Sequence, residues 1–216
     1  KDKGFDEFCK KCFAVGNLYN NHMVLQRQYD FIWCILAKAF LIKIDRSCKN
    51  KFDILLEFCL NDLKCAMHQE LYLLALYFKN DPSIGRVFAK LSKDYNKGIE
   101  YALENTTWDL FHSRMTFEHT RFYDTVENIV ILPYFATNDK GVYQYLSKCL
   151  FKAVIIDHGK MIPAYRSSIE LSNYIMNESL QFQLYDEEHI MKRKVDVTQV
   201  NINLIKSKLL QELKTI

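Results

Sequence analysis

The chain has 216 residues, of which 49% are hydrophobic, 14% aromatic and 25% charged, and its formal net charge is +3. This hydrophobic content supports a sizeable folded core and excludes an intrinsically disordered chain. So small a net charge gives no argument of its own for a nucleic acid or an anionic membrane as the partner. The chain contains only six Gly and three Pro, which disfavours turn-rich sheets and favours long helices.

The cysteines indicate the cellular compartment of the chain, and the length of its apolar runs bears on whether it spans a membrane. Seven Cys is an odd number, and most lie within apolar segments, as Cys34 does in FIWCILA and Cys59 in LLEFCL. We therefore expect free thiols in a reducing intracellular compartment, cytoplasmic or nuclear, rather than a secreted disulfide scaffold. The longest apolar run, 31–37, is too short to span a bilayer. Because the chain begins at Lys1 rather than Met, we expect residues 1–216 to be a single helical domain taken from a longer protein.

Apolar side chains recur at helical spacing along most of the chain. Pro82 cannot continue a helix, and Asp81 can cap the next one. The β-branched runs 129–132 (IVIL) and 153–156 (AVII) are interpreted as buried helix, because helical periodicity continues on both sides. The pattern predicts an all-α fold of about eight helices. We place them at 5–14, 18–45, 51–79 with a break near Asn61, 83–104, 107–131, 141–157, 164–177 and 198–214, and leave 178–197 unassigned.

Two segments of the chain are similar, 70–93 (ELYLLALYFKNDPSIGRVFAKLSK) and 127–148 (ENIVILPYFATNDKGVYQYLSK). Each runs from Glu through an apolar stretch, Tyr-Phe, Asn-Asp and Gly to Leu-Ser-Lys, and such internal similarity indicates stacked helical units. The stretch LALYFKNDPSIGRVFAKLSK resembles a HEAT or armadillo unit, which implies a short α-solenoid with an extended binding surface. The alternative is an irregular helical bundle whose turns share the Asn-Asp pair.

Four residues have the chemistry of a zinc site. Cys9 and Cys12 form a CxxC and Cys65 and His68 form a CxxH, so together they would suit tetrahedral zinc. Both pairs also lie in predicted helices, where the cysteines join apolar stripes as small hydrophobic residues. Zinc is the one cofactor that the sequence suggests, and a purely structural role for these residues is the alternative.

The predicted helix 107–131 carries basic and imidazole side chains. Arg114 and His119 resemble the Arg-x4–6-His motif of the HEPN family, all-helical domains that often cleave RNA. The resemblance implies a metal-independent ribonuclease in which Arg114 and His119 activate the ribose 2′-hydroxyl and hold the phosphate. The alternative pairs Arg114 with Glu118 at i, i+4 on a solvated face. His112 shares a helix face with His119, which suits metal ligands, an acid–base pair or two core histidines.

The sequence contains no Gly-rich phosphate loop and no Ser nucleophile elbow. Its only run of three basic residues, Lys192-Arg193-Lys194, is interpreted as solvated surface rather than as a phosphate contact. The leading hypothesis is a helical interaction or scaffold domain that binds a protein partner through inter-helix grooves and its amphipathic C-terminal helix. The alternatives are the HEPN-like ribonuclease, with RNA as its partner, and the zinc-binding domain.

Overall fold

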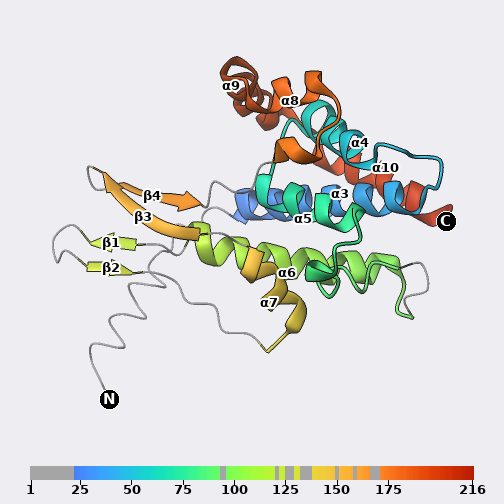
Figure 1. The fold of residues 1–216 in the computed structure, drawn as a ribbon, viewed down its shortest axis with the longest axis horizontal. Helices are drawn as coiled ribbons and strands as arrows, with labels where there is room; N and C mark the ends of the chain where they lie inside the picture. Colours follow the sequence, from blue (N-terminus) through green and yellow to red (C-terminus); the bar gives the residue numbers. More distant parts are fainter. Residues whose placement is uncertain are drawn as a thin grey trace.

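The computed structural model describes residues 22–92, 96–119, 122–124, 129–131, 138–148, 151–157, 160–165 and 171–216. Over these residues, the chain forms a body of packed helices with two short β-hairpins extending from one end (Figure 1). The predicted all-α fold is confirmed for the packed body, while a solenoid-like stacking of its helices stays a prediction. The predicted helix 5–14 lies outside the described residues. None of the helices in the described part is long and apolar enough to cross a membrane.

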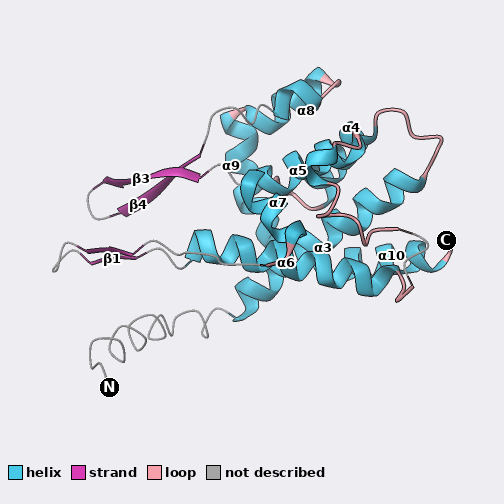
Figure 2. Ribbon diagram, turned by 60° about the horizontal axis from the view of Figure 1, so that its bottom comes forward, coloured by secondary structure: helices cyan, strands magenta, loops and turns pink. Residues whose placement is uncertain are grey.

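Helix α3 (His22–Ile44) is the centre of the core, which confirms the predicted helix 18–45 over the described residues. The whole apolar run 31–37 is buried, because neighbouring helices cover α3 (Figures 1 and 2). A helix that is apolar on every side is stable only when it is covered in this way. The helices that contact it are α4 (Lys51–Glu57), α5 (His68–Phe78), α6 (Ile99–His119) and α10 (Ile202–Lys214).

The predicted break near Asn61 is confirmed. It contains a π-helical turn, η1 (Phe58–Asp62), followed by a short connection to α5. The amide of Leu63 donates to the carbonyl of Phe58 at 3.1 Å, and the amide of Cys65 donates to the carbonyl of Cys59 at 2.9 Å. These two carbonyl groups of the segment are therefore hydrogen-bonded. A wide turn of this kind inserts into a helix without leaving its backbone unsatisfied.

The predicted helix 83–104 is wrong. The segment begins with a 3-10 turn, η2 (Pro82–Ile84), and continues in further turns over the described residues up to 92. Gly98 then has φ +83°, a conformation that interrupts a helix and favours Gly. Helix α6 therefore begins at Ile99, ahead of the predicted start at 107. The apolar stripe predicted here is nevertheless buried, through Ile84, Phe88 and Leu91.

The two β-hairpins show that the interpretation of the runs 129–132 and 153–156 as buried helix is wrong for residues 129–131 and 153–156, which the structure describes. β-branched residues favour strands when a partner strand is supplied by the fold, and both runs have one. The pairs are antiparallel, β1 (Phe122–Asp124) with β2 (Ile129–Ile131), and β3 (Phe151–Asp157) with β4 (Lys160–Tyr165).

The second hairpin changes two predicted helices. Helix α7 (Lys140–Lys148) ends well before the predicted end at 157. Pro163, which was predicted to open a helix at 164–177, lies in β4 opposite Val154. Each strand of a two-stranded sheet has an open edge, where Pro is tolerated.

The two similar segments adopt different structures. Their first halves are α5 in one case and β2 in the other, and their second halves are turns after η2 and helix α7. Their Asn-Asp turns do act alike, because Asp81 accepts from the Ser83 amide and Asp139 accepts from the Gly141 amide. The shared pattern therefore encodes a helix-capping turn, and the described residues give it no equivalent helical unit.

The C-terminal part covers α3 and adds a helical hairpin. Lys206 Nζ lies 2.7 Å from Asp30 Oδ1 where α10 packs along α3, and α10 confirms the predicted helix 198–214 with a later start. The unassigned segment 178–197 forms α8 (Glu178–Tyr185) and α9 (Glu187–Asp196), flanked by the 3-10 turns η3 (Leu171–Tyr174) and η4 (Val197–Gln199). In Figure 1, α8 and α9 lie on the opposite side of α3 from α6 and α7.

Candidate functional site

An ion pair joins α5 to α6 and includes one predicted catalytic residue. Arg114 Nη1 donates to Glu70 Oε1 at 2.9 Å and to Glu70 Oε2 at 2.7 Å. Glu70 is fully buried, and the Arg114 side chain is 19% exposed. The described geometry therefore gives Arg114 a role in holding two helices together. The predicted alternative partner, Glu118, has its side chain outside the described residues.

The structure places the two histidines of α6 differently. His119 is the last residue of the helix, and its side chain lies outside the described ones, so the ribonuclease pair with Arg114 stays a prediction. His112 is exposed, and its ring centroid lies 5.0 Å from that of Trp108, which also contacts Tyr29 and Phe111. His112 thus belongs to an aromatic cluster at the surface and is not a core histidine.

The predicted zinc ligands are divided between two parts of the chain. Cys9 and Cys12 lie outside the described residues, whereas Cys65 and His68 lie near the Arg114–Glu70 pair. Burial is the largest influence on the pKa of both groups, and the charges of Arg114 and Glu70 act on them in opposite directions. Burial raises the pKa of the Cys65 thiol to about 11 and lowers the pKa of His68. A raised thiol pKa disfavours the thiolate that zinc binds. In the described part of the chain, no three His, Cys, Asp or Glu side chains are arranged to hold a metal.

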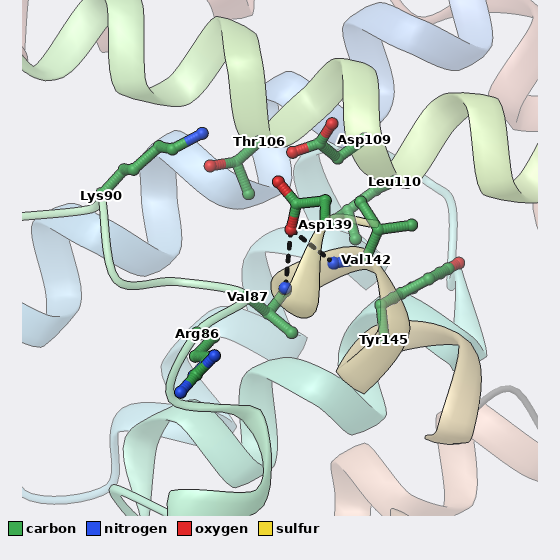
Figure 3. A pocket seen from close by; sticks show the side chains of 10 residues that line it. Arg86, Val87, Lys90, Thr106, Asp109, Leu110, Asp139, Val142 and Tyr145 are labelled. Carbon is green, nitrogen blue, oxygen red and sulfur yellow. Dashed lines mark hydrogen bonds between the residues drawn. The ribbon is translucent and has the colours of Figure 1, made fainter. Parts of the chain in front are cut away.

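A small cavity of about 40 Å³, lined by both polar and apolar side chains, lies where α7 meets α6 and the segment after η2 (Figure 3). Asp139 Oδ1 accepts from the Gly141 amide at 2.6 Å and from the Val142 amide at 3.1 Å. Burial raises the pKa of Asp109, and the nearby Asp139 acts in the same direction while Lys90 opposes it. The cavity has room for water but is far below the roughly 300–1,000 Å³ of small-molecule sites. It is a packing junction between elements rather than a substrate site.

A larger, open groove of about 470 Å³ runs beside the end of α10. The sequence predicted inter-helix grooves and the C-terminal helix as contact surfaces, and the use of this groove as such a surface stays a prediction. Lys38 Nζ and Glu212 Oε2 lie 3.8 Å apart on its wall. Its apolar lining consists of Leu41, Ile42, Ile44, Ile54 and Ile216.

Five of the ten large hydrophobic side chains that are exposed in the described chain lie on the α8–α9 hairpin or just before it. Five large side chains there are between 45% and 76% exposed. Large apolar groups that gather on one part of a surface mark a site of interaction with a partner. We call this surface the α8–α9 face, and it consists of Met176, Phe182, Tyr185, Met191 and Val195.

The α8–α9 hairpin is held in a defined shape. Asp186 ends α8 and caps α9, where it accepts from the His189 amide at 3.1 Å. The Arg193 guanidinium reaches back from α9 and donates to the carbonyls of Gln183 and Leu184, the latter at 3.0 Å. Cationic side chains that bind the last carbonyls of a helix stabilise its end. The central residue of the predicted solvated run 192–194 is therefore structural, while Lys192 and Lys194 are exposed.

No family model, curated protein or solved structure matches this chain. The function therefore has to be argued from the geometry of its surfaces. Sequence reasoning missed the α8–α9 face, because 178–197 is mostly polar and its apolar residues form no stripe long enough to predict a buried helix. The available signal was the repeated occurrence of isolated large apolar residues, Phe182, Met191 and Val195, within a strongly charged segment.

Proposed function

We propose that the chain is a protein-binding domain whose binding surface is the α8–α9 face. The observation that carries this proposal is the exposure of four large apolar side chains on one hairpin and of Met176 just before it. Burying apolar surface yields about 25 cal/mol per Å², and aromatic residues and Met are enriched where proteins meet. We further propose an intracellular site of action, which the free thiols of Cys34, Cys48, Cys59 and Cys65 support.

The contacts within the hairpin favour binding without rearrangement. Leu180 and Leu184 are buried and anchor α8 to the body, and Arg193 fixes α9 against α8. A surface that is already ordered loses less conformational entropy when a partner binds. The face also carries charges of both signs, with Glu187 and Lys192 exposed on α9. An RNA-binding surface needs an excess of positive charge, so the α8–α9 face suits a protein better.

Site-specific photo-crosslinking tests the proposal. The crosslinkable residue p-benzoylphenylalanine replaces Met191 or Val195 in the full chain, expressed in the cells it comes from. The matched control replaces Leu204, which is 52% exposed on α10 and lies outside the face. We expect adducts of higher mass at positions 191 and 195 and none at 204. Adducts of equal yield at all three positions, or none at 191 and 195, would overturn the proposal.

A further inference from the structure

We infer that the partner seated on the α8–α9 face is a second copy of this chain, with the two α9 helices antiparallel about a two-fold axis. The inference rests on the proposed function, since it names the partner of the same surface. Its first support is the exposure of α9, because the contacts with α8 leave one side of this helix uncovered. Among the residues of α9, all of them described, none is buried. Much of the stability of a helix in a protein comes from packing of its apolar side, so a partner that covers Met191 and Val195 would add to the contacts that α9 already makes with α8.

The second support is the order of charges on the exposed side of α9. Glu187 and Glu188 are exposed in its first turn, and Lys192 and Lys194 are exposed toward its end, with Met191 between them. In an antiparallel pair centred on Met191, Glu188 of one copy faces Lys194 of the second copy, because each is three residues from the centre. The two-fold axis forms this pair twice.

The antiparallel order follows from the same charges. In a parallel pair, the acidic first turns of the two copies would face each other, and so would the basic last turns. The like charges would then repel each other. The antiparallel pair also brings the two copies of Met191 together on the axis, and by the same spacing Glu187 of one copy lies opposite Val195 of the second copy. Phe182 and Tyr185 of α8 widen the apolar surface, so that two hairpins can pack as a four-helix arrangement.

The helix dipole gives the charge order a second physical reason. Acidic residues favour the start of a helix and basic residues favour its end, whether or not a partner is present. The dipole does not account for the exposure of Met191 and Val195 on the same side of α9. The experiment therefore has to separate pairing between two chains from stabilisation within one helix.

Charge reversal with rescue makes that separation. One variant of the full chain is acidic on α9 (Lys192→Glu, Lys194→Glu), and the other is basic (Glu187→Lys, Glu188→Lys). In sedimentation equilibrium at low salt, we expect wild type to dimerise, and each variant alone to raise the dissociation constant of the dimer at least about tenfold. An equimolar mixture of the two variants should recover wild-type association as a mixed dimer. The dipole acts within each chain, so mixing cannot relieve its effect.

Two controls keep the outcome interpretable. Far-UV circular dichroism shows whether each variant folds, and Met191→Lys, which places two like charges on the axis without changing the first or last turn, should also abolish the dimer. A wild type that stays monomeric, or a mixture no more associated than its components, would overturn the inference. A monomeric wild type that still crosslinks through position 191 to a different protein leaves the protein-binding proposal standing. Loss of both dimer and crosslinks removes both proposals.

Discussion

Replacing Arg114 by Met is expected to destabilise the fold by about 3–5 kcal/mol, because the change leaves a charged carboxylate unpaired in the core. Arg114 Nη1 donates to both carboxylate oxygens of Glu70, at 2.9 and 2.7 Å, and Glu70 is fully buried. Domains typically have a free energy of unfolding of about 5–15 kcal/mol, so the loss is a large part of the total. At about 2–4 °C per kcal/mol for a domain of this size, Tm should fall by about 6–20 °C.

Urea unfolding followed by circular dichroism measures the loss. The double variant Arg114→Met with Glu70→Leu removes both charges and should recover most of the stability, since a buried pair replaced by apolar groups is often near neutral. Lys38→Met is the matched control, because its 3.8 Å pair with Glu212 is largely solvated and should contribute less than about 1 kcal/mol. A cost below about 1 kcal/mol for Arg114→Met, or a double variant no more stable than the single one, would refute the reasoning.

Three further predictions concern backbone packing, thiol reactivity and pH. Gly141→Ala places a Cβ 2.9 Å from a backbone carbonyl oxygen and should cost about 1–3 kcal/mol in urea unfolding, whereas Gly85→Ala, with its nearest neighbour at 3.5 Å, should not destabilise the fold. The Cys48 thiol donates to Asp45 Oδ2 at 3.2 Å, which raises the pKa of Cys48, so Asp45→Ala should speed iodoacetamide labelling near neutral pH, measured by mass spectrometry. Burial raises the pKa of Asp109, so its ionised carboxylate destabilises the folded state. Asp109→Asn should therefore stabilise the fold at pH values above that pKa. In urea unfolding measured at a series of pH values, this gain in stability should be lost as the pH falls through the pKa.

The sequence predicted those elements whose cause is local. The run 31–37 is apolar on every side, so it had to be covered, and α3 is the covered central helix. The polar interruption near Asn61 predicted the break that the structure fills with a π-helical turn. In both places, composition within a few residues decides the structure.

Elements that depend on a distant partner could not be predicted in the same way. The β-branched runs suit a helix or a strand, and pairing with β1 and β4 makes the described residues 129–131 and 153–156 strands. The apolar residues of the predicted helix 83–104 have helical spacing. A capped 3-10 turn begins the segment and Gly98 interrupts it, so the described residues up to 92 form turns rather than a helix. The ion pair between Arg114 and Glu70 joins residues far apart in the chain. The i, i+4 rule applies only within one helix, so it could not predict this pair.

The sequence could not predict the α8–α9 face for a related reason. A sequence pattern shows which residues are apolar, but exposure depends on what the rest of the fold leaves uncovered. Leu180 and Leu184 share one side of α8 and are buried, while Phe182 lies on the opposite side and is exposed. The helical spacing separates the two sides, but it does not tell which side the rest of the fold covers. Once the exposure of Met191 and Val195 is known, the charges beside them on α9 can be interpreted as part of a binding surface and not only as solvated side chains.

The ribonuclease hypothesis can be separated from folding only through His119. Because Arg114 pairs with buried Glu70, lost activity in an Arg114 variant would follow from unfolding as readily as from lost chemistry. His119 is the last residue of α6, and the Tm of His119→Ala can be measured beside its activity. As a protein-binding domain, the wild-type chain is expected to leave a mixed RNA substrate intact in EDTA. Cleavage by wild type that disappears in a folded His119→Ala variant would contradict that expectation and favour the HEPN-like alternative.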